Sequence, residues 1–200
     1  MLLNGAPRSG KSSIASSMQA VRPGRWTNLG VDSTMAATAE AMLPGIGLRP
    51  GGERPDLEPL VLDGYRELFD ALAEVARRGG NVVADVGIHD DYSRPLGLWL
   101  EAAERLDGLT AHVVGVRCPL PVIMARRAEA PVRGRSRYAT ADADGTVPTA
   151  VRRWQRAVHE PGRYDLEVDT SLQTSEQCAR RILAHLDTTA PSALARHRSL

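Results

Sequence analysis

Lysine is almost absent from this sequence. Its 200 residues include 25 lysines and arginines, and 24 of them are arginine, so Lys11 is the single lysine. Arginine carries a wide planar fork, whereas lysine carries a compact ammonium on a thin stem. A lysine kept in such an arginine-rich chain predicts a site that the fork does not fit. Chance retention on a solvated surface is the alternative, and the neighbours of Lys11 decide between the two.

Several other features are scarce, and each scarcity excludes a class of protein. Two cysteines, Cys118 and Cys178, are too few for a disulfide framework. No apolar run approaches the roughly 20 residues of a membrane-spanning helix, and no signal-peptide pattern follows Met1. A formal net charge of +1 excludes binding to nucleic acid or anionic membranes through bulk charge. We therefore expect a cytoplasmic protein with neither partner.

Lys11 lies inside a glycine-rich motif. Residues 5–13 read Gly-Ala-Pro-Arg-Ser-Gly-Lys-Ser-Ser, which matches the pattern G-x-x-x-x-G-K-[ST]. In this pattern backbone N–H groups and the N-terminus of the next helix form an anion cradle. The lysine reaches the β- and γ-phosphates, and the serine after it offers a hydroxyl to Mg²⁺. The predicted phosphate-binding residues are Gly5, Ala6, Pro7, Arg8, Ser9, Gly10, Lys11, Ser12 and Ser13.

The rest of the chain alternates between apolar runs and amphipathic segments. Strands are predicted over residues 2–4, 26–32, 81–85, 111–117 and 164–168. Helices are predicted over residues 11–21, 56–78, 93–106, 148–159 and 174–186, with Ser93 and Thr174 as N-caps. This alternation predicts a three-layer α/β phosphate-loop fold with a five-stranded parallel sheet. We expect one domain over residues 1–187 and a frayed tail over residues 188–200.

Two carboxylates follow predicted strands, where ligands of parallel sheets bind. Asp32 ends the second strand and could remove the proton of a phosphoryl acceptor; an N-cap for residues 33–36 is the alternative. Asp85 ends the third strand and could bind Mg²⁺ together with Ser12, with a helix cap as the alternative. Trp154 is interpreted as a core residue, because no basic groove accompanies it.

A cluster of arginines follows the fourth predicted strand. Its members are Arg126, Arg127, Arg133, Arg135 and Arg137. A solvated face is one interpretation of such a charge run. The other is an arginine-rich lid over about residues 126–150, which would neutralise charge on a transferred phosphoryl group and exclude water.

The motifs together resemble the chloramphenicol phosphotransferase-like family of small phosphate-loop kinases. The points of match are Leu2-Leu3-Asn4-Gly5, Gly30-Val31-Asp32-Ser33, Val114-Gly115-Val116-Arg117-Cys118, Val158-His159-Glu160 and the segment from Tyr164 to Thr170. The resemblance implies a sheet like that of shikimate kinase, ATP and Mg²⁺ as cofactors, and phosphorylation of a small-molecule hydroxyl. It also makes a homo-oligomer plausible.

The resemblance assigns roles to particular residues. It implies that Asp32 is the catalytic base and that Lys11, Arg133 and Arg135 hold the γ-phosphate. It places Thr170 beside the adenine, with Arg126 or Arg127 stacked on the ring. We take Arg127 as the candidate for this contact. The chain departs from the family at Ala84, where a second acid can stand, and over residues 34–60, which do not look like the chloramphenicol enzyme.

The expected activity is therefore phosphoryl transfer to a small natural product or antibiotic. One alternative is a kinase of a central metabolite or nucleotide. Thr34, two residues after Asp32, departs from the Asp-x-Asp of shikimate kinases, whereas Arg49 and Arg54 could bind an acceptor phosphate. An alternative of another class is a nucleotide-binding regulator or hydrolysis switch.

Overall fold

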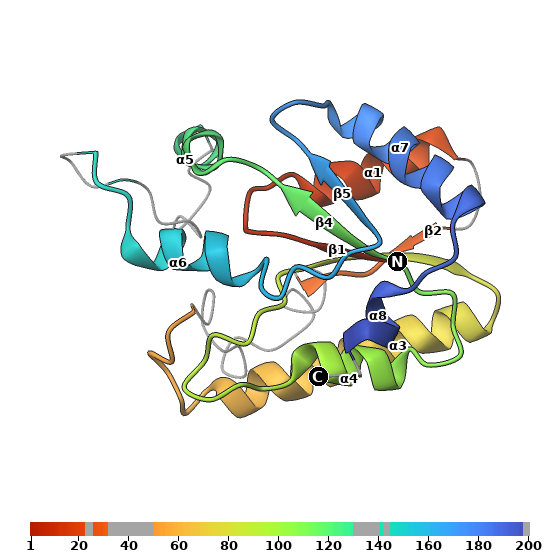
Figure 1. The fold of residues 1–200 in the computed structure, drawn as a ribbon, viewed down its shortest axis with the longest axis horizontal. Coiled ribbons are helices and arrows are strands. Elements are labelled where there is room, and N and C mark those ends of the chain that lie inside the picture. Colours follow the sequence, from red (N-terminus) through yellow and green to blue (C-terminus); the bar gives the residue numbers. More distant parts are fainter. Residues whose placement is uncertain (23–25, 32–49, 130–140, 142–144, 198–200) are drawn as a thin grey trace.

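The fold is a parallel sheet between two layers of helices (Figure 1). The computed structural model describes residues 1–22, 26–31, 50–129, 141 and 145–197. The strands are β1 (Leu2–Asn4), β2 (Trp26–Asn28), β3 (Asn81–Val86), β4 (Val113–Arg117) and β5 (Leu166–Asp169). All neighbours run parallel, in the order β2-β3-β1-β4-β5. The predicted five-stranded parallel sheet is confirmed.

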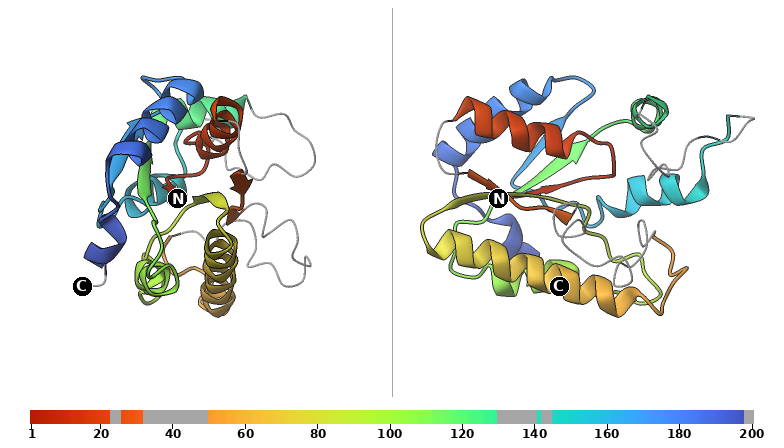
Figure 2. Two further views of the ribbon diagram at one scale, coloured as in Figure 1. Left: turned by 90° about the vertical axis from the view of Figure 1, so that its right-hand side faces the viewer. Right: turned by 180° about the vertical axis from the view of Figure 1, so that it is seen from behind.

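The helices cover both faces of this sheet. They are α1 (Lys11–Val21), α3 (Glu58–Arg77), α4 (Leu98–Arg105), α5 (Leu120–Ala128), α6 (Thr149–Ala157), α7 (Ser175–Thr188) and α8 (Ala193–His197). Helices α1 and α7 pack together on one face, and α3, α4 and α8 pack on the other (Figures 1 and 2). Each face has its own apolar core. The central strands are buried on both sides, which explains why they are continuous apolar runs in the sequence.

Two predicted boundaries differ from the structure by more than two residues, and competing partners explain one of them. Strand β2 ends at Asn28 rather than at residue 32. Helix α4 begins at Leu98 rather than at Ser93, after Gly97 with a φ of 68°. Ser93 does not cap this helix, because the buried Glu58 carboxylate accepts hydrogen bonds from its backbone N–H and its hydroxyl. Asp90 accepts instead from the N–H of Gly97, at 2.9 Å.

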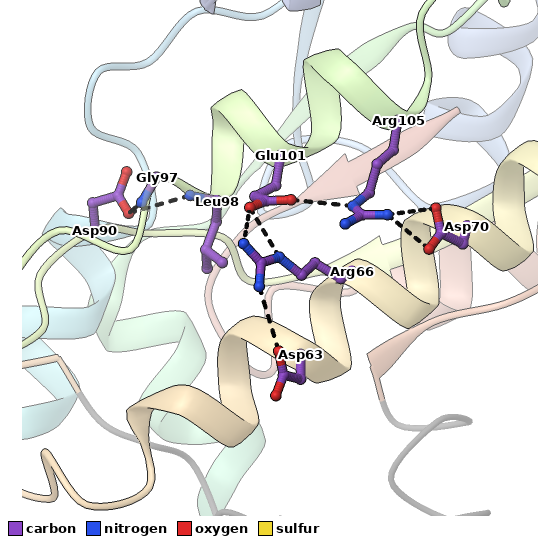
Figure 3. A network of polar contacts seen from close by, with 8 residues as sticks. All are labelled: Asp63, Arg66, Asp70, Asp90, Gly97, Leu98, Glu101 and Arg105. Atoms are coloured by element: carbon purple, nitrogen blue, oxygen red, sulfur yellow. Dashed lines mark hydrogen bonds and ion pairs between the residues drawn. The ribbon is translucent and has the colours of Figure 1, made fainter.

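An ionic network links α3 to α4 (Figure 3). Glu101 accepts from Arg66 at 2.5 Å and from Arg105 at 3.1 Å. Arg105 also pairs with Asp70 at 2.7 Å, and Arg66 pairs with Asp63 at 3.5 Å. Hydrogen bonds from Arg66 and from Arg105 outweigh burial, which acts in the opposite direction, and hold the pKa of Glu101 below its usual range. Such partly exposed pairs contribute at most about 1 kcal/mol each.

The C-terminal segment, expected from the sequence to be a frayed tail over residues 188–200, contains a short helix in the structure. Helix α8 packs on α4, where the rings of His197 and Trp99 stack with centroids 4.5 Å apart. Asp165 accepts from the N–H of Ala193 at 2.8 Å. Leu194 is buried in the core on this face. The burial depends on a surface formed by distant residues, which a local pattern of small polar residues does not reveal.

We expect Leu194→Ala to reduce the free energy of unfolding by about 2 kcal/mol, because it removes buried methyl groups from the core. Urea denaturation measures the effect. Leu172→Ala is the matched control, since Leu172 is 82% exposed and its loss should change stability by less than about 0.5 kcal/mol. Equal stabilities of the two variants would show that the tail does not pack in solution.

Candidate active site

The segment between β1 and α1 forms a tightly wrapped loop at the carboxyl edge of the sheet. Arg8 and Gly10 have φ angles of 71° and 97°, which turn the backbone around the loop. Gly5 leaves no room for a side chain, because a Cβ there would lie 2.5 Å from the carbonyl oxygen of Val116. Helix α1 begins at Lys11, so its positive end faces the loop. The arrangement is an anion cradle.

Lys11 lies against this loop. Its ammonium donates to the carbonyl oxygens of Gly5 at 2.8 Å and Ala6 at 3.0 Å. The two contacts hold the charge over the concave side of the wrapped backbone, on a stem thin enough to fit there. The solitary lysine thus lies against the glycine-rich loop, and its contact with phosphate stays a prediction.

Ser12 and Asp85, the two predicted Mg²⁺-binding residues, meet in the structure. The Ser12 hydroxyl donates to Oδ2 of Asp85 at 2.5 Å. Strand β3 lies beside β1, with Asp85 opposite Leu3, so the sheet brings the carboxylate to the start of α1. Asp85 lies within β3 and does not cap a helix. The contact places one hydroxyl and one carboxylate side by side, and their binding of Mg²⁺ stays a prediction.

The donor set suits a magnesium ion that keeps part of its water shell. Mg²⁺ takes few protein oxygens and completes its octahedron with water and substrate phosphates. Ser12 and Asp85 supply one hydroxyl and one carboxylate beside the cradle. Within the described ranges, no three histidine, cysteine, aspartate or glutamate side chains gather as metal ligands.

Gly30 provides the space for the Asp85 carboxylate. A Cβ on Gly30 would lie 1.7 Å from Oδ1 of Asp85. We expect Gly30→Ala to displace this carboxylate and raise the Mg²⁺ concentration that half-saturates nucleotide binding by about tenfold. Gly64→Ala is the control, because nothing lies within 4 Å of the Cβ it would add in α3. Equal Mg²⁺ dependence in both variants would contradict the assignment of Asp85.

Thr170 and Arg126 close the other side of the loop. The Thr170 hydroxyl donates to the carbonyl oxygen of Ser9 at 2.7 Å. The Arg126 guanidinium donates to Oγ1 and to the carbonyl oxygen of Thr170, at 3.0 and 2.8 Å, and the backbone carbonyl oxygen of Arg126 accepts from the Arg8 guanidinium at 2.6 Å. Arg127, which the sequence analysis takes as the residue stacked on adenine, is buried in α5. The geometry favours Arg126 as the side chain beside a nucleotide; contact of either arginine with adenine stays a prediction.

Three candidate catalytic residues, Asp32, Arg133 and Arg135, lie outside the described residues. Most of the predicted lid, including residues 130–140, also lies outside them. The roles of these residues therefore remain predictions.

Sequence reasoning missed an aromatic group beside the loop. Trp154, interpreted from sequence as core, is only partly buried and packs against a small buried cluster that includes Ala6 of the loop. Its indole nitrogen lies 3.7 Å from the position of a Cβ on Gly87. His89 stacks on Tyr92 with ring centroids 4.3 Å apart, and meets the edge of Trp154 at 6.1 Å. The available signal was Gly87 itself, a glycine two residues after Asp85 at the strand end.

A family model matches almost the whole chain. Residues 1–187 match the model described as chloramphenicol phosphotransferase-like protein. The chain belongs to this family. The match confirms the resemblance stated from the motifs. A search of curated proteins gives no match.

Solved structures show the same fold at low identity. A sugar kinase from Janibacter sp. HTCC2649 is 18% identical, with a TM-score of 0.60 and coverage of 93% of this chain and 92% of that chain. The tunicamycin resistance protein of Deinococcus radiodurans is 19% identical, with a TM-score of 0.59 and coverage of 96% and 97%. The APS kinase of Mycobacterium tuberculosis, solved with AMPPNP and APS, is 17% identical, with a TM-score of 0.58 and coverage of 94% and 96%.

The part of the chain that the structure describes contains no helix with both the length and the apolar character needed to span a bilayer.

Proposed function

We propose that this protein transfers the γ-phosphoryl group of ATP to a hydroxyl of a small molecule, with Mg²⁺ as the metal. The observation that carries the proposal is the contact of Ser12 with Asp85 beside a phosphate loop whose lysine is already folded over it. Family membership supports the same reaction class.

Each part of the site has a separate role in binding ATP. The N–H groups of the loop bind the phosphate oxygens, and the Lys11 ammonium balances the charge that spreads over them. Ser12 and Asp85 would hold Mg²⁺, which supplies charge neutralisation between the β- and γ-phosphates when bound. Arg133 and Arg135 would add positive charge from the lid. Thr170, with Arg126 against it, would border the adenine.

Asp32 would accept the acceptor's proton. The acceptor oxygen then forms a bond to the γ-phosphorus while the bond from that phosphorus to the β–γ bridging oxygen breaks. The products are a phosphate monoester and ADP, and the proton leaves Asp32 to solvent.

An antibiotic or another natural product is the acceptor class we propose. The aromatic group of His89, Tyr92 and Trp154 beside Gly87 suits an acceptor with an apolar or planar part. Arg54, a candidate for binding the phosphate of a nucleotide acceptor, instead pairs with Asp56 at 2.7 Å. The tunicamycin resistance protein shows that this fold occurs in a resistance protein.

A panel of hydroxyl compounds tests the proposal. The panel combines antibiotics, sugars, nucleosides and shikimate, each incubated with the protein, ATP and Mg²⁺ and analysed by mass spectrometry. A gain of about 80 Da on one acceptor, equal to the transferred phosphoryl group, is the expected result. Release of ADP without a phosphorylated acceptor indicates a hydrolase and contradicts the proposal.

A further inference from the structure

Four residues of the family-like motifs have no role in the reaction just described. They are Asn4, Gly115, His159 and Tyr164, and they come from four separate segments of the chain. The structure brings them together on the face of the sheet that α3, α4 and α8 cover, next to the start of the phosphate loop. Their contacts form a chain of buried polar groups.

Asn4 is the centre of this arrangement. It is fully buried, ends β1 and directly precedes Gly5 of the phosphate loop. Its amide nitrogen donates to the carbonyl oxygen of Val158 at 2.7 Å, and its amide oxygen accepts from the N–H of Ile88 at 2.8 Å. One side chain thus joins the start of the loop to the end of α6 and to the segment after β3.

Tyr164 and His159 extend the chain. The ring of Tyr164 lies against Gly115, where an added Cβ would be 2.5 Å from the ring, so only glycine admits it. The Tyr164 hydroxyl lies 3.3 Å from the Asn4 amide nitrogen and 2.8 Å from Nδ1 of His159. Burial, then the positive charges of Arg117 and Lys11, lowers the pKa of His159 to about 4. The imidazole is therefore neutral at pH 7, so its Nδ1 can accept a hydrogen bond from the Tyr164 hydroxyl.

The two partners of Asn4, Val158 and Ile88, lie next to residues that border the phosphate loop. Val158 follows α6 and belongs with Ala6 of the loop to one small buried cluster, against which Trp154 packs. Ile88 is next to His89 and follows Gly87, which faces the indole of Trp154. Hydrogen bonds between buried polar groups fix the relative positions of these groups more narrowly than apolar packing does.

We propose that Asn4 and Tyr164 are positioning residues that hold the phosphate loop in register with α6 and with the segment after β3. The inference rests on the proposed function in taking MgATP as the ligand of the loop. A purely structural network would contribute to stability alone. A positioning network also lowers the cost of binding, because the loop is already arranged for the phosphates.

Two variants and one control separate these roles. Tyr164→Phe removes only the hydroxyl, and Asn4→Leu replaces the amide by an apolar group of similar size. His112→Gln is the control: His112 is also buried, but it lies just before β4, at the opposite edge of the sheet from the loop. Thermal unfolding without nucleotide and calorimetric titration with MgATP are measured for each protein.

We expect the Kd for MgATP to rise about fivefold in Tyr164→Phe and at least about tenfold in Asn4→Leu, as loss of one or more buried hydrogen bonds implies. His112→Gln should lower the melting temperature and leave the Kd within about twofold of wild type, because it removes no contact to the loop. A wild-type Kd in both site variants, with lowered melting temperatures, would overturn the proposal. If Asn4→Leu does not fold, Tyr164→Phe decides alone.

This result is independent of the acceptor panel. A wild-type protein that binds MgATP but phosphorylates no acceptor refutes the proposed function, while a raised Kd in Tyr164→Phe still supports positioning. Conversely, a phosphorylated acceptor together with unchanged Kd values refutes positioning alone.

Discussion

Phosphoryl transfer by Lys11→Ala is expected to be about a thousandfold slower than by the wild type, because the charge nearest the transferring group is lost. The ammonium donates to two backbone carbonyls of the loop, and we expect the variant still to fold. Lys11→Arg should recover little of this loss. Its wide fork cannot occupy the narrow position over the Gly5 and Ala6 carbonyls, although its charge is the same. Steady-state kcat and KM for ATP measure both effects.

The matched control is Arg180→Ala. Arg180 is an exposed cation of α7 that pairs with Glu176, remote from the loop. Its removal should leave turnover unchanged, which separates the loss at Lys11 from a general effect of net charge. Near wild-type turnover in Lys11→Arg would refute the explanation given for the solitary lysine.

Asp32→Asn is expected to lower kcat by about 10²- to 10⁴-fold, the range for loss of a general base. The affinity for MgATP should remain unchanged, because the amide keeps the size of the carboxylate and the phosphate loop is intact. Single-turnover kinetics with saturating MgATP and acceptor measure the chemical step, and calorimetry measures the affinity.

Asp63→Asn serves as the control for Asp32→Asn, since Asp63 is an exposed acid of α3 that pairs with Arg66. It should retain full turnover. A wild-type kcat in Asp32→Asn would remove Asp32 from the role of base and return it to the alternative, an N-cap for the residues that follow.

The sheet and the phosphate site were predictable from sequence because local patterns encode them. The motif around Lys11 is continuous, and the apolar run before Asp85 indicates a strand buried on both faces. Placing Ser12 next to Asp85 needed one further rule, that the carboxyl ends of parallel strands meet at one edge. The structure has that contact, at 2.5 Å.

The failures arise where distant residues compete for a partner. Ser93 has good capping chemistry, but Glu58, 35 residues away, binds its N–H and hydroxyl. The pattern of the last dozen residues indicates no helix, yet residues 193–197 form α8, which contacts Trp99 and Asp165. The choice between Arg126 and Arg127 depends on how α5 is rotated against Thr170, which no local pattern specifies.

The most direct test of the central claim is a crystal structure of the protein with AMPPNP and Mg²⁺. We expect the Lys11 ammonium to leave the carbonyl oxygens of Gly5 and Ala6 and to bind the β- and γ-phosphates, with Mg²⁺ next to Ser12 and Asp85. A triphosphate bound elsewhere, with Lys11 still on the two carbonyls, would contradict it.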